Sequence, residues 1–347
     1  MEQVELFKVA GTIAGLAGIV LIVFFLLFKE IIRKNIFPKM TKRQAYRVVI
    51  IILFLIWSLA IFVISAWVYK SKMIQNNLSM NEVPLIQETS DLDILNQYKG
   101  NVDVPNMIKI EEGKYLIGLS EESVANLVAE KIGNREDFSN ETPQIKYSIK
   151  GYFISKYEIS VKQYRQFAVQ KNKQLPENLK DNNFNADDQP IMGVSWYDAR
   201  EYCDWLSNKT GEKYRLPTEI EWEIAAKGTD NRIFPDGNNR PNTNNCNFYE
   251  QFNKTSPVDK TPMNFSYFKV VNMAGNIAEW CDNNFEENYY QKLHQNIDYL
   301  SSGDKKCIRG GSWKDNIFFV RCTARVGLLP DTKKETVGFR IVKILNQ

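Results

Sequence analysis

Charged and apolar positions are distributed unevenly along this chain of 347 residues. Two runs near the N-terminus, residues 9–28 and 48–69, contain no charged side chain. At about 1.5 Å of rise per residue, each run as a helix would cross a hydrocarbon core of roughly 30 Å. We therefore predict two transmembrane helices, 9–28 and 48–69, within a membrane anchor at residues 1–72. One alternative is that either run is a buried core helix. Another is that the first run is a cleaved signal peptide, but this run is too long for a signal peptide.

The connector between the two runs, residues 29–47, is strongly basic. Its basic residues are Lys29, Arg33, Lys34, Lys39, Lys42, Arg43 and Arg47, and its single acid is Glu30. Short basic loops stay in the cytoplasm, and aromatic residues such as Trp67 and Tyr69 favour a membrane interface. We therefore predict an inner- or plasma-membrane protein whose N-terminus and C-terminal domain both lie outside the cytoplasm. Gly11 and Gly15 form a Gly-x-x-x-Gly pair, which indicates association between helices.

The rest of the chain predicts a spacer followed by one domain. Residues 73–106 are acidic and lack an apolar period, which indicates a spacer, and residues 107–347 form the domain. In the domain, residues 107–118 predict two short strands around a turn, and residues 145–159 alternate as further strands do. Three helices are predicted to begin with capping boxes. The boxes are Ser160 with Gln163, Ser195 with Asp198, and Thr218 with Glu221.

The cysteines and the single histidine limit the chemistry that is available. The five cysteines are Cys203, Cys246, Cys281, Cys307 and Cys322, an odd number that leaves at least one thiol unpaired in an oxidising compartment. Cys203 shares a helical face with Ala199, Tyr202 and Leu206, so we predict that it is buried. His294 is the only histidine, which argues against a multi-histidine metal site. The net charge of +3 gives no indication of a nucleic-acid partner, and we expect neither haem nor a nucleotide.

Five motifs in the domain resemble those of one known family. They are Pro190-Ile-Met-Gly-Val-Ser-Trp-Tyr-Asp-Ala-Arg-Glu-Tyr-Cys-Asp-Trp-Leu206, Tyr214-Arg-Leu-Pro-Thr-Glu-Ile-Glu-Trp-Glu223, Asn272-Met-Ala-Gly-Asn-Ile-Ala-Glu-Trp280, Arg309-Gly-Gly-Ser-Trp313 and Gly338-Phe-Arg340. In order and spacing they are similar to the formylglycine-generating enzyme, or sulfatase-modifying factor, domain over about residues 107–342. The resemblance implies an irregular α+β fold related to C-type lectins. It does not fix an activity, because the same domain serves oxidases, iron enzymes and binding proteins.

The resemblance also implies two structural Ca²⁺ sites. In the first, the ligands would be backbone oxygens of Asn272, Gly275 and Ile277 with the carboxylate of Glu279, an oxygen-only set that suits a hard cation. The second site carries over less closely, because its loop is shorter. Its ligands would be Asn247, Phe248, Glu250 and Phe252. The alternative for both loops is a network of hydrogen bonds without a metal.

The copper chemistry of the family's oxidases is not expected here. The oxidases hold Cu(I) between two cysteines, the first three residues after the serine of Arg-Gly-Gly-Ser and the second five residues later. Those positions are Asp315 and Val320 in this chain. The cysteines are therefore interpreted as structural. A disulfide of Cys281 with either Cys307 or Cys322 is a candidate that the sequence does not resolve.

Two functions remain as hypotheses. The favoured one is a membrane-anchored, non-catalytic protein that binds an unidentified envelope protein or glycan. Related lectin-like proteins bind ligands beside this motif, which implies a binding surface here. It would comprise Ser312, Trp313, Lys314, Asp315, Asn316 and Phe318, with Leu328 nearby. The alternative is an oxidoreductase of the formylglycine-generating type, or another enzyme with a non-standard site. The family's iron-dependent relatives need three histidines, and the single His294 of this chain excludes their mechanism.

Overall fold

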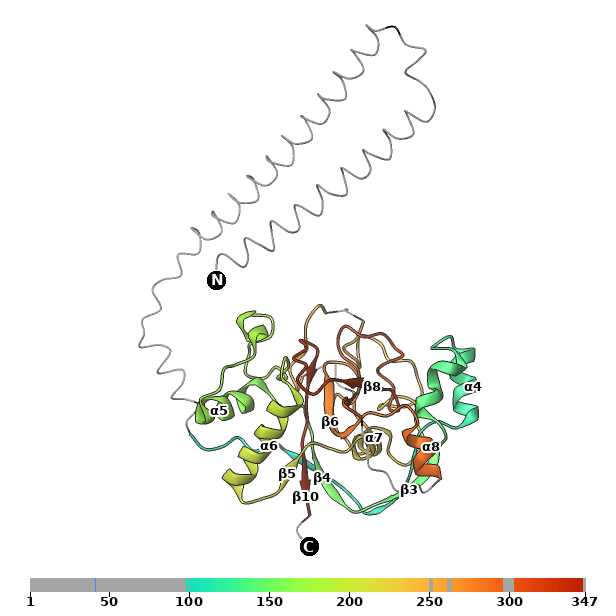
Figure 1. Cartoon of the computed structure of the whole chain (residues 1–347), viewed down its shortest axis with the longest axis horizontal. Helices are drawn as coiled ribbons and strands as arrows, with labels where there is room; N and C mark the ends of the chain where they lie inside the picture. The colour runs from blue at the N-terminus through green and yellow to red at the C-terminus, as the bar shows by residue number, and fades with distance from the viewer. Residues whose placement is uncertain are drawn as a thin grey trace. The chain divides into compact units, whose positions relative to one another are not determined.

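The computed structural model describes Thr41, Tyr98 and residues 100–249, 252–260, 264–295 and 303–345 (Figure 1). In these residues, no helix has the length and apolar character needed to span a membrane. The predicted spans 9–28 and 48–69, the loop 29–47 and the Gly11/Gly15 pair lie outside the described residues.

The domain contains seventeen short elements, among the described residues, in a mixed order. The strands are β1 (Met107–Ile110), β2 (Gly113–Ile117), β3 (Ile145–Ile149), β4 (Tyr152–Ser155), β5 (Tyr214–Arg215), β6 (Ala278–Asn284), β7 (Lys306–Arg309), β8 (Arg325–Leu328), β9 (Val337–Gly338) and β10 (Val342–Ile344). The helices are α4 (Glu121–Ala129), α5 (Val161–Lys171), α6 (Trp196–Thr210), α7 (Glu219–Lys227) and α8 (Tyr289–His294), with 3-10 turns η2 (Arg135–Glu141) and η3 (Glu177–Lys180). In Figure 1, α5 and α6 lie at one end of the domain and α4 and α8 at the other.

The strands form three small sheets. Their orders are β1-β4-β10-β5, β2-β3 and β8-β7-β6-β9. The two strands expected in residues 107–118 exist as β1 and β2, but they do not pair with each other. Instead β1 pairs with β4, and β2 pairs with β3. The third sheet joins four strands that are separated in the sequence. The Arg309-Gly-Gly-Ser motif begins at the last residue of its strand β7.

The three predicted capping boxes are confirmed. Ser160, Ser195 and Thr218 are the N-caps of α5, α6 and α7, and each accepts a hydrogen bond from the third residue of its helix. Gly228 ends α7 with a φ of 72°, a conformation that glycine adopts without strain. These boundaries follow from local hydrogen bonds, which is why the sequence alone predicts them.

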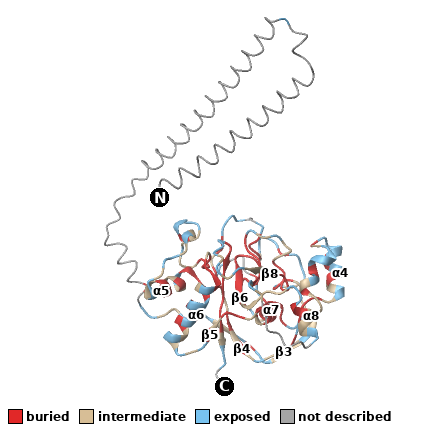
Figure 2. Ribbon diagram, in the orientation of Figure 1, coloured by how far each residue is buried: buried red, intermediate tan, exposed pale blue. Residues whose placement is uncertain are grey.

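The core consists of three apolar clusters, and Figure 2 shows the buried residues concentrated around β6 and α7. The first contains Phe167, Leu206 and Trp280, the second contains Trp222, Cys281 and Tyr290, and the third contains Phe138, Phe234 and Val320. The face of α6 with Ala199, Tyr202, Cys203 and Leu206 packs in the first cluster, which confirms the predicted burial of Cys203. The segment before β1 also contacts this part of the domain. The hydroxyl of Tyr98 donates to Asp187 at 2.7 Å, and the backbone N–H of Asp103 donates to Gln166 of α5 at 2.8 Å.

Candidate functional site

A tight turn follows β7 and organises the candidate site. Gly310 and Gly311 have φ values of 88° and 64°, which disfavour any residue with a Cβ. A Cβ on Gly310 would lie 2.9 Å from the Trp222 ring, and one on Gly311 would lie 2.9 Å from the carbonyl oxygen of Phe319. Ser312 then donates from its N–H and its hydroxyl to the carboxylate of Asp315, at 2.8 Å and 2.6 Å. The turn is therefore fixed by close packing and by one side-chain acceptor.

A small cavity of about 140 Å³ lies beside this turn. Its lining includes the apolar side chains of Ile308, Phe319 and Leu328 and the polar side chains of Asp315 and Lys334. This volume accommodates one apolar side chain of a partner and is too small for a drug-sized ligand.

The two positions at which the oxidases carry copper ligands are occupied by side chains with other contacts. The carboxylate of Asp315 is the acceptor for Ser312, and the side chain of Val320 is fully buried in the third apolar cluster. All five cysteines are buried free thiols. Burial raises the pKa of the Cys203, Cys246 and Cys322 thiols, so these thiols stay protonated and are poor ligands or nucleophiles.

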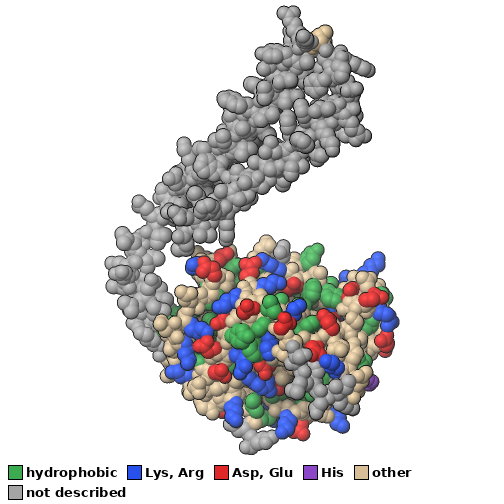
Figure 3. Space-filling model, in the orientation of Figure 1, with side chains coloured by type: hydrophobic (Ala, Val, Ile, Leu, Met, Phe, Trp, Pro, Cys, Tyr) green, Lys and Arg blue, Asp and Glu red, His purple; other side chains and the backbone are tan. Residues whose placement is uncertain are grey.

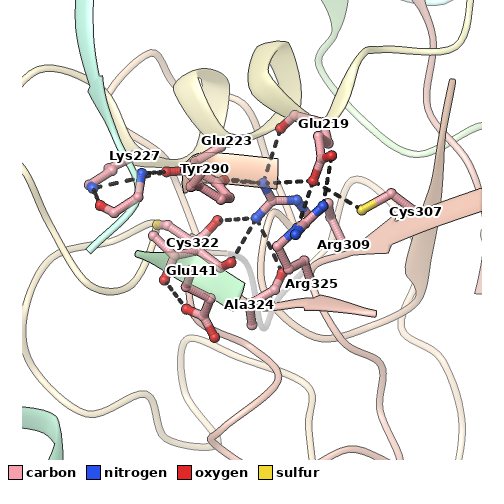
Figure 4. A network of polar contacts seen from close by, with 12 residues as sticks. Glu141, Glu219, Glu223, Lys227, Tyr290, Cys307, Arg309, Cys322, Ala324 and Arg325 are labelled. Atoms are coloured by element: carbon pink, nitrogen blue, oxygen red, sulfur yellow. Dashed lines mark hydrogen bonds and ion pairs between the residues drawn. The ribbon is translucent and has the colours of Figure 1, made fainter. Parts of the chain in front are cut away.

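A buried ionic network includes Arg309, the residue directly before the glycine turn (Figure 4). Glu219 forms a two-pronged ion pair with Arg325, at 2.8 Å and 2.9 Å. Arg309 donates at 2.9 Å to Glu223 and at 2.8 Å to the hydroxyl of Tyr290. Because all of these groups are buried, each charge depends on its partner, and the network fixes α7 against β7 and β8.

Sequence reasoning missed this network. The signal for it in the sequence is that Glu219 and Glu223 are spaced for one face of a helix, and that Arg309 begins the Arg309-Gly-Gly-Ser-Trp313 motif and Arg325 follows it. A second buried pair continues the network, since Arg321 donates at 2.6 Å and 2.8 Å to the two carboxylate oxygens of Glu141.

The glycine turn after β7 and strand β6, which contains Glu279 and Trp280, are built from two of the five motifs, and a family model covers them. The model for the sulfatase-modifying factor enzyme 1-like domain matches residues 95–345. The chain belongs to the sulfatase-modifying factor family.

Two curated relatives of this family show an active and an inactive form. The chain is 31% identical over 182 residues to the mouse formylglycine-generating enzyme, in a match that covers 48% of the chain and 47% of the enzyme. It is 33% identical over 167 residues to the bovine inactive C-alpha-formylglycine-generating enzyme 2, covering 44% of the chain and 49% of the relative. The chain thus spans about half the length of these curated relatives.

A solved structure supports the fold. PvdO from Pseudomonas aeruginosa superposes with a TM-score of 0.58 at 23% identity, over 70% of this chain and 95% of that one. This likeness concerns the sulfatase-modifying factor fold alone.

The predicted binding surface is only partly exposed in this sulfatase-modifying factor domain. Lys314 and Asn316 are exposed and Asp315 is half-buried, whereas Ser312 and Trp313 are buried. Phe318, which was expected to be presented at the groove, is half-buried. Its ring stacks on Phe138 with centroids 5.6 Å apart, and the Arg321 guanidinium lies 4.4 Å from its centroid. Apolar packing in the third cluster accounts for this position.

The first predicted calcium loop is held by side chains of the protein. Both carboxylate oxygens of Glu279 contact the guanidinium of Arg340, and the Trp222 indole N–H donates to one of them at 2.7 Å. Asn272 and Asn276 donate to the buried carboxyl of Glu158, at 3.2 Å and 2.7 Å.

The charges in this loop do not favour a cation at Glu279. Arg340 already balances the charge of Glu279, so this residue fits poorly as the negative ligand. Burial raises the pKa of Glu158 to about 7, despite the nearby Arg340, which acts to lower it. Glu158 was missed from the sequence because it stands in an ordinary polar position before a helix.

The second predicted calcium loop shows a better fit. The side-chain oxygen of Asn247 is buried and has no hydrogen-bond partner among the described residues, although its amide nitrogen donates to the carbonyl of Lys254 at 2.9 Å. An unpartnered buried oxygen is what a cation ligand looks like before the cation is added. Phe248 is buried and Phe252 is exposed, while Glu250 lies outside the described residues.

Proposed function

We propose that this chain is a non-catalytic member of the sulfatase-modifying factor family that binds a partner beside the Arg309–Trp313 turn. The observation that carries the proposal is the state of the two copper positions. Asp315 accepts a hydrogen bond from the Ser312 hydroxyl, and the side chain of Val320 is buried in the third apolar cluster. Its relation to an inactive relative in cattle is consistent with such a role.

The cavity beside the turn supports a protein partner over a glycan. Its wall is largely apolar, and sugar recognition depends instead on dense polar contacts. Leu328 at the end of β8 lines the cavity, and the exposed Lys314 and Asn316 stand at the adjacent surface. An apolar side chain from an extended segment of an envelope protein would fill the cavity, and polar contacts would surround it.

A tether to the membrane completes the proposal. The two uncharged runs at 9–28 and 48–69 and the basic loop between them support an anchor with the binding domain outside the cytoplasm. Figure 3 shows basic and acidic side chains interspersed over one face of the domain, which suits a protein partner better than a polyanion.

Calcium is proposed as a structural ion at the second loop. Asn247 would supply its unpartnered side-chain oxygen, and Phe248 and Phe252 would supply backbone oxygens. The ion would order the long loop that follows α7 and would take no part in chemistry.

The test compares two adjacent leucines in the full chain. Leu328→Trp fills the cavity, whereas Leu329→Trp adds the same bulk at an exposed neighbour, 47% exposed, that does not line it. Partner recovery from native membranes by crosslinking should fall for Leu328→Trp by roughly 30-fold, as for loss of a contact of about 2 kcal/mol. Leu329→Trp should behave as wild type.

A parallel assay addresses the enzymatic alternative. The purified full chain is supplied with Cu(I) and a cysteine-containing peptide, and oxygen consumption is measured. We expect none above the background of copper and peptide alone. Oxygen consumption that requires the protein, or undiminished recovery by Leu328→Trp, would contradict the proposed function.

A further inference from the structure

Two of the buried cysteines face each other across adjacent strands. In the antiparallel pair of β6 and β7, Glu279 is opposite Arg309 and Trp280 is opposite Ile308. Continued by one position, this register places Cys281 of β6 beside Cys307 of β7, at the start of the stretch between Trp280 and Asn284 in which the register shifts. Directly opposite residues in such a pair have Cα atoms about 4.5–5.5 Å apart, which is within the range that a disulfide requires.

The side chains point to the same face of the sheet. Trp280 and Ile308 pack together in the first apolar cluster, and Cys281 and Cys307, one residue farther, pack together in the second. After burial, the Cys307 side chain is the next cause that raises the pKa of the Cys281 thiol, so the two side chains lie close to each other. The spacing, the common face and the contact thus agree.

We propose that Cys281 and Cys307 are a redox pair that closes a cross-strand disulfide when the domain folds in the presence of a disulfide oxidant. In the reaction, one cysteine thiolate attacks a sulfur of the oxidant and releases one of its thiols. The second cysteine then attacks the mixed disulfide and releases the other. Two cysteine thiols lose two electrons and two protons in total, and the oxidant disulfide is reduced to two thiols.

The surroundings determine when this reaction can occur. Both thiols are fully buried, so an oxidant has no access to them in the folded domain. Burial, and then the Cys307 side chain, raise the pKa of the Cys281 thiol, which further slows attack after folding. The disulfide therefore forms while the sheet assembles, and once formed it is protected.

The neighbouring ionic network tolerates the change. The Cys307 thiol donates to Glu219 at 3.3 Å, and oxidation removes that hydrogen (Figure 4). Glu219 keeps its two contacts with Arg325, so its charge remains compensated. The disulfide would covalently link the strand that carries Glu279 to the strand that leads into the glycine turn.

Cys307, and not Cys322, is the proposed partner of Cys281. Cys322 is also buried in the second cluster, but its backbone N–H bonds to Ile233, and it precedes β8 on the far side of β7. This inference does not depend on the proposed partner binding.

The experiment maps thiols after folding. The full chain is synthesised in a cell-free system with detergent and a mixture of oxidised and reduced glutathione, denatured without reductant, alkylated and digested with trypsin. Trypsin separates the two cysteines at Lys292 and Lys306, which leaves Cys307 in the tripeptide Cys307-Ile308-Arg309. We expect this tripeptide to be joined to the peptide that contains Cys281, so that two of the five thiols are lost to alkylation.

Two variants make the outcome decisive. Cys322→Ser should keep the link, and Cys281→Ser should leave Cys307 alkylated. Folding with reduced glutathione only, followed by oxidised glutathione added to the folded chain, should give five alkylated cysteines. The proposal is overturned if all five are alkylated after folding with oxidised glutathione, or if a different pair is joined.

Discussion

At the scale of single residues, the buried arginines determine whether the site can exist. Arg325 donates to both oxygens of Glu219, and both side chains are fully buried. Removing one partner of such a pair leaves an uncompensated charge in the interior, whereas an exposed pair contributes little.

We therefore expect Arg325→Met to lower the free energy of unfolding by about 3–5 kcal/mol. Arg135→Met is the matched control, because Arg135 pairs with Glu121 on the surface, and it should cost less than about 1 kcal/mol. Urea denaturation followed by tryptophan fluorescence measures both. Equal effects from the two substitutions would show that the buried pair has no special weight.

Asn247 is the residue at which the calcium proposal is tested. If its unpartnered oxygen binds Ca²⁺, calcium at about 100 times its Kd adds roughly 2.7 kcal/mol to folding. A strong chelator should then lower the Tm of the wild type, and Asn247→Ala should have a lower Tm that the chelator does not change. Glu158→Gln, a change in the other loop, should keep the chelator response. A wild-type Tm that is indifferent to the chelator would refute the ion.

At the scale of elements, local signals were readable and distant ones were not. The starts of α5, α6 and α7 depend on residues three apart, so the sequence predicts them. The pairing of β1 with β4 depends on a partner more than forty residues away, and nothing in residues 107–118 specifies it. The ionic network is hidden for the same reason, because Glu219 and Arg325 look like surface positions until the fold brings them together.

The turn after β7 offers a comparison between two glycines. Gly310 and Gly211 both have positive φ, at 88° and 77°, but a Cβ at Gly211 meets nothing within 4 Å, whereas one at Gly310 lies 2.9 Å from Trp222. Gly211→Ala should cost about 1 kcal/mol through backbone strain alone. Gly310→Ala should cost about 1–3 kcal/mol more through overpacking, measured by denaturation. Equal losses in the free energy of unfolding would mean that the Trp222 ring can move away from the added Cβ at no energetic cost.

At the scale of the whole molecule, the family is readable from the sequence and the role is not. Five motifs keep their order because they build one fold, and the family model matches the same segment. The role depends on which side chains lie at the turn after β7 and on which partner the chain binds. Phe318 illustrates this, since a side chain that follows a loop motif was expected at the surface and is half-buried, with its ring stacked on Phe138.

Membrane topology is the prediction that belongs to the complete chain. We propose that residues 29–47 form a short loop between two membrane spans, and its basic side chains would favour the cytoplasm, because positive residues resist translocation. A periplasmic-type reporter fused after Gln347, such as an alkaline phosphatase that needs an oxidising compartment, should therefore be active.

Replacing Lys39, Lys42, Arg43 and Arg47 with Gln weakens the bias, and reporter activity should fall several-fold as a fraction of chains inserts in the opposite orientation. A fusion to a fluorescent protein that matures only in the cytoplasm should be dim in the wild type and brighter in the variant. An inactive phosphatase beside a bright fluorescent fusion in the wild type would place the domain in the cytoplasm, where glutathione would also keep Cys281 and Cys307 reduced.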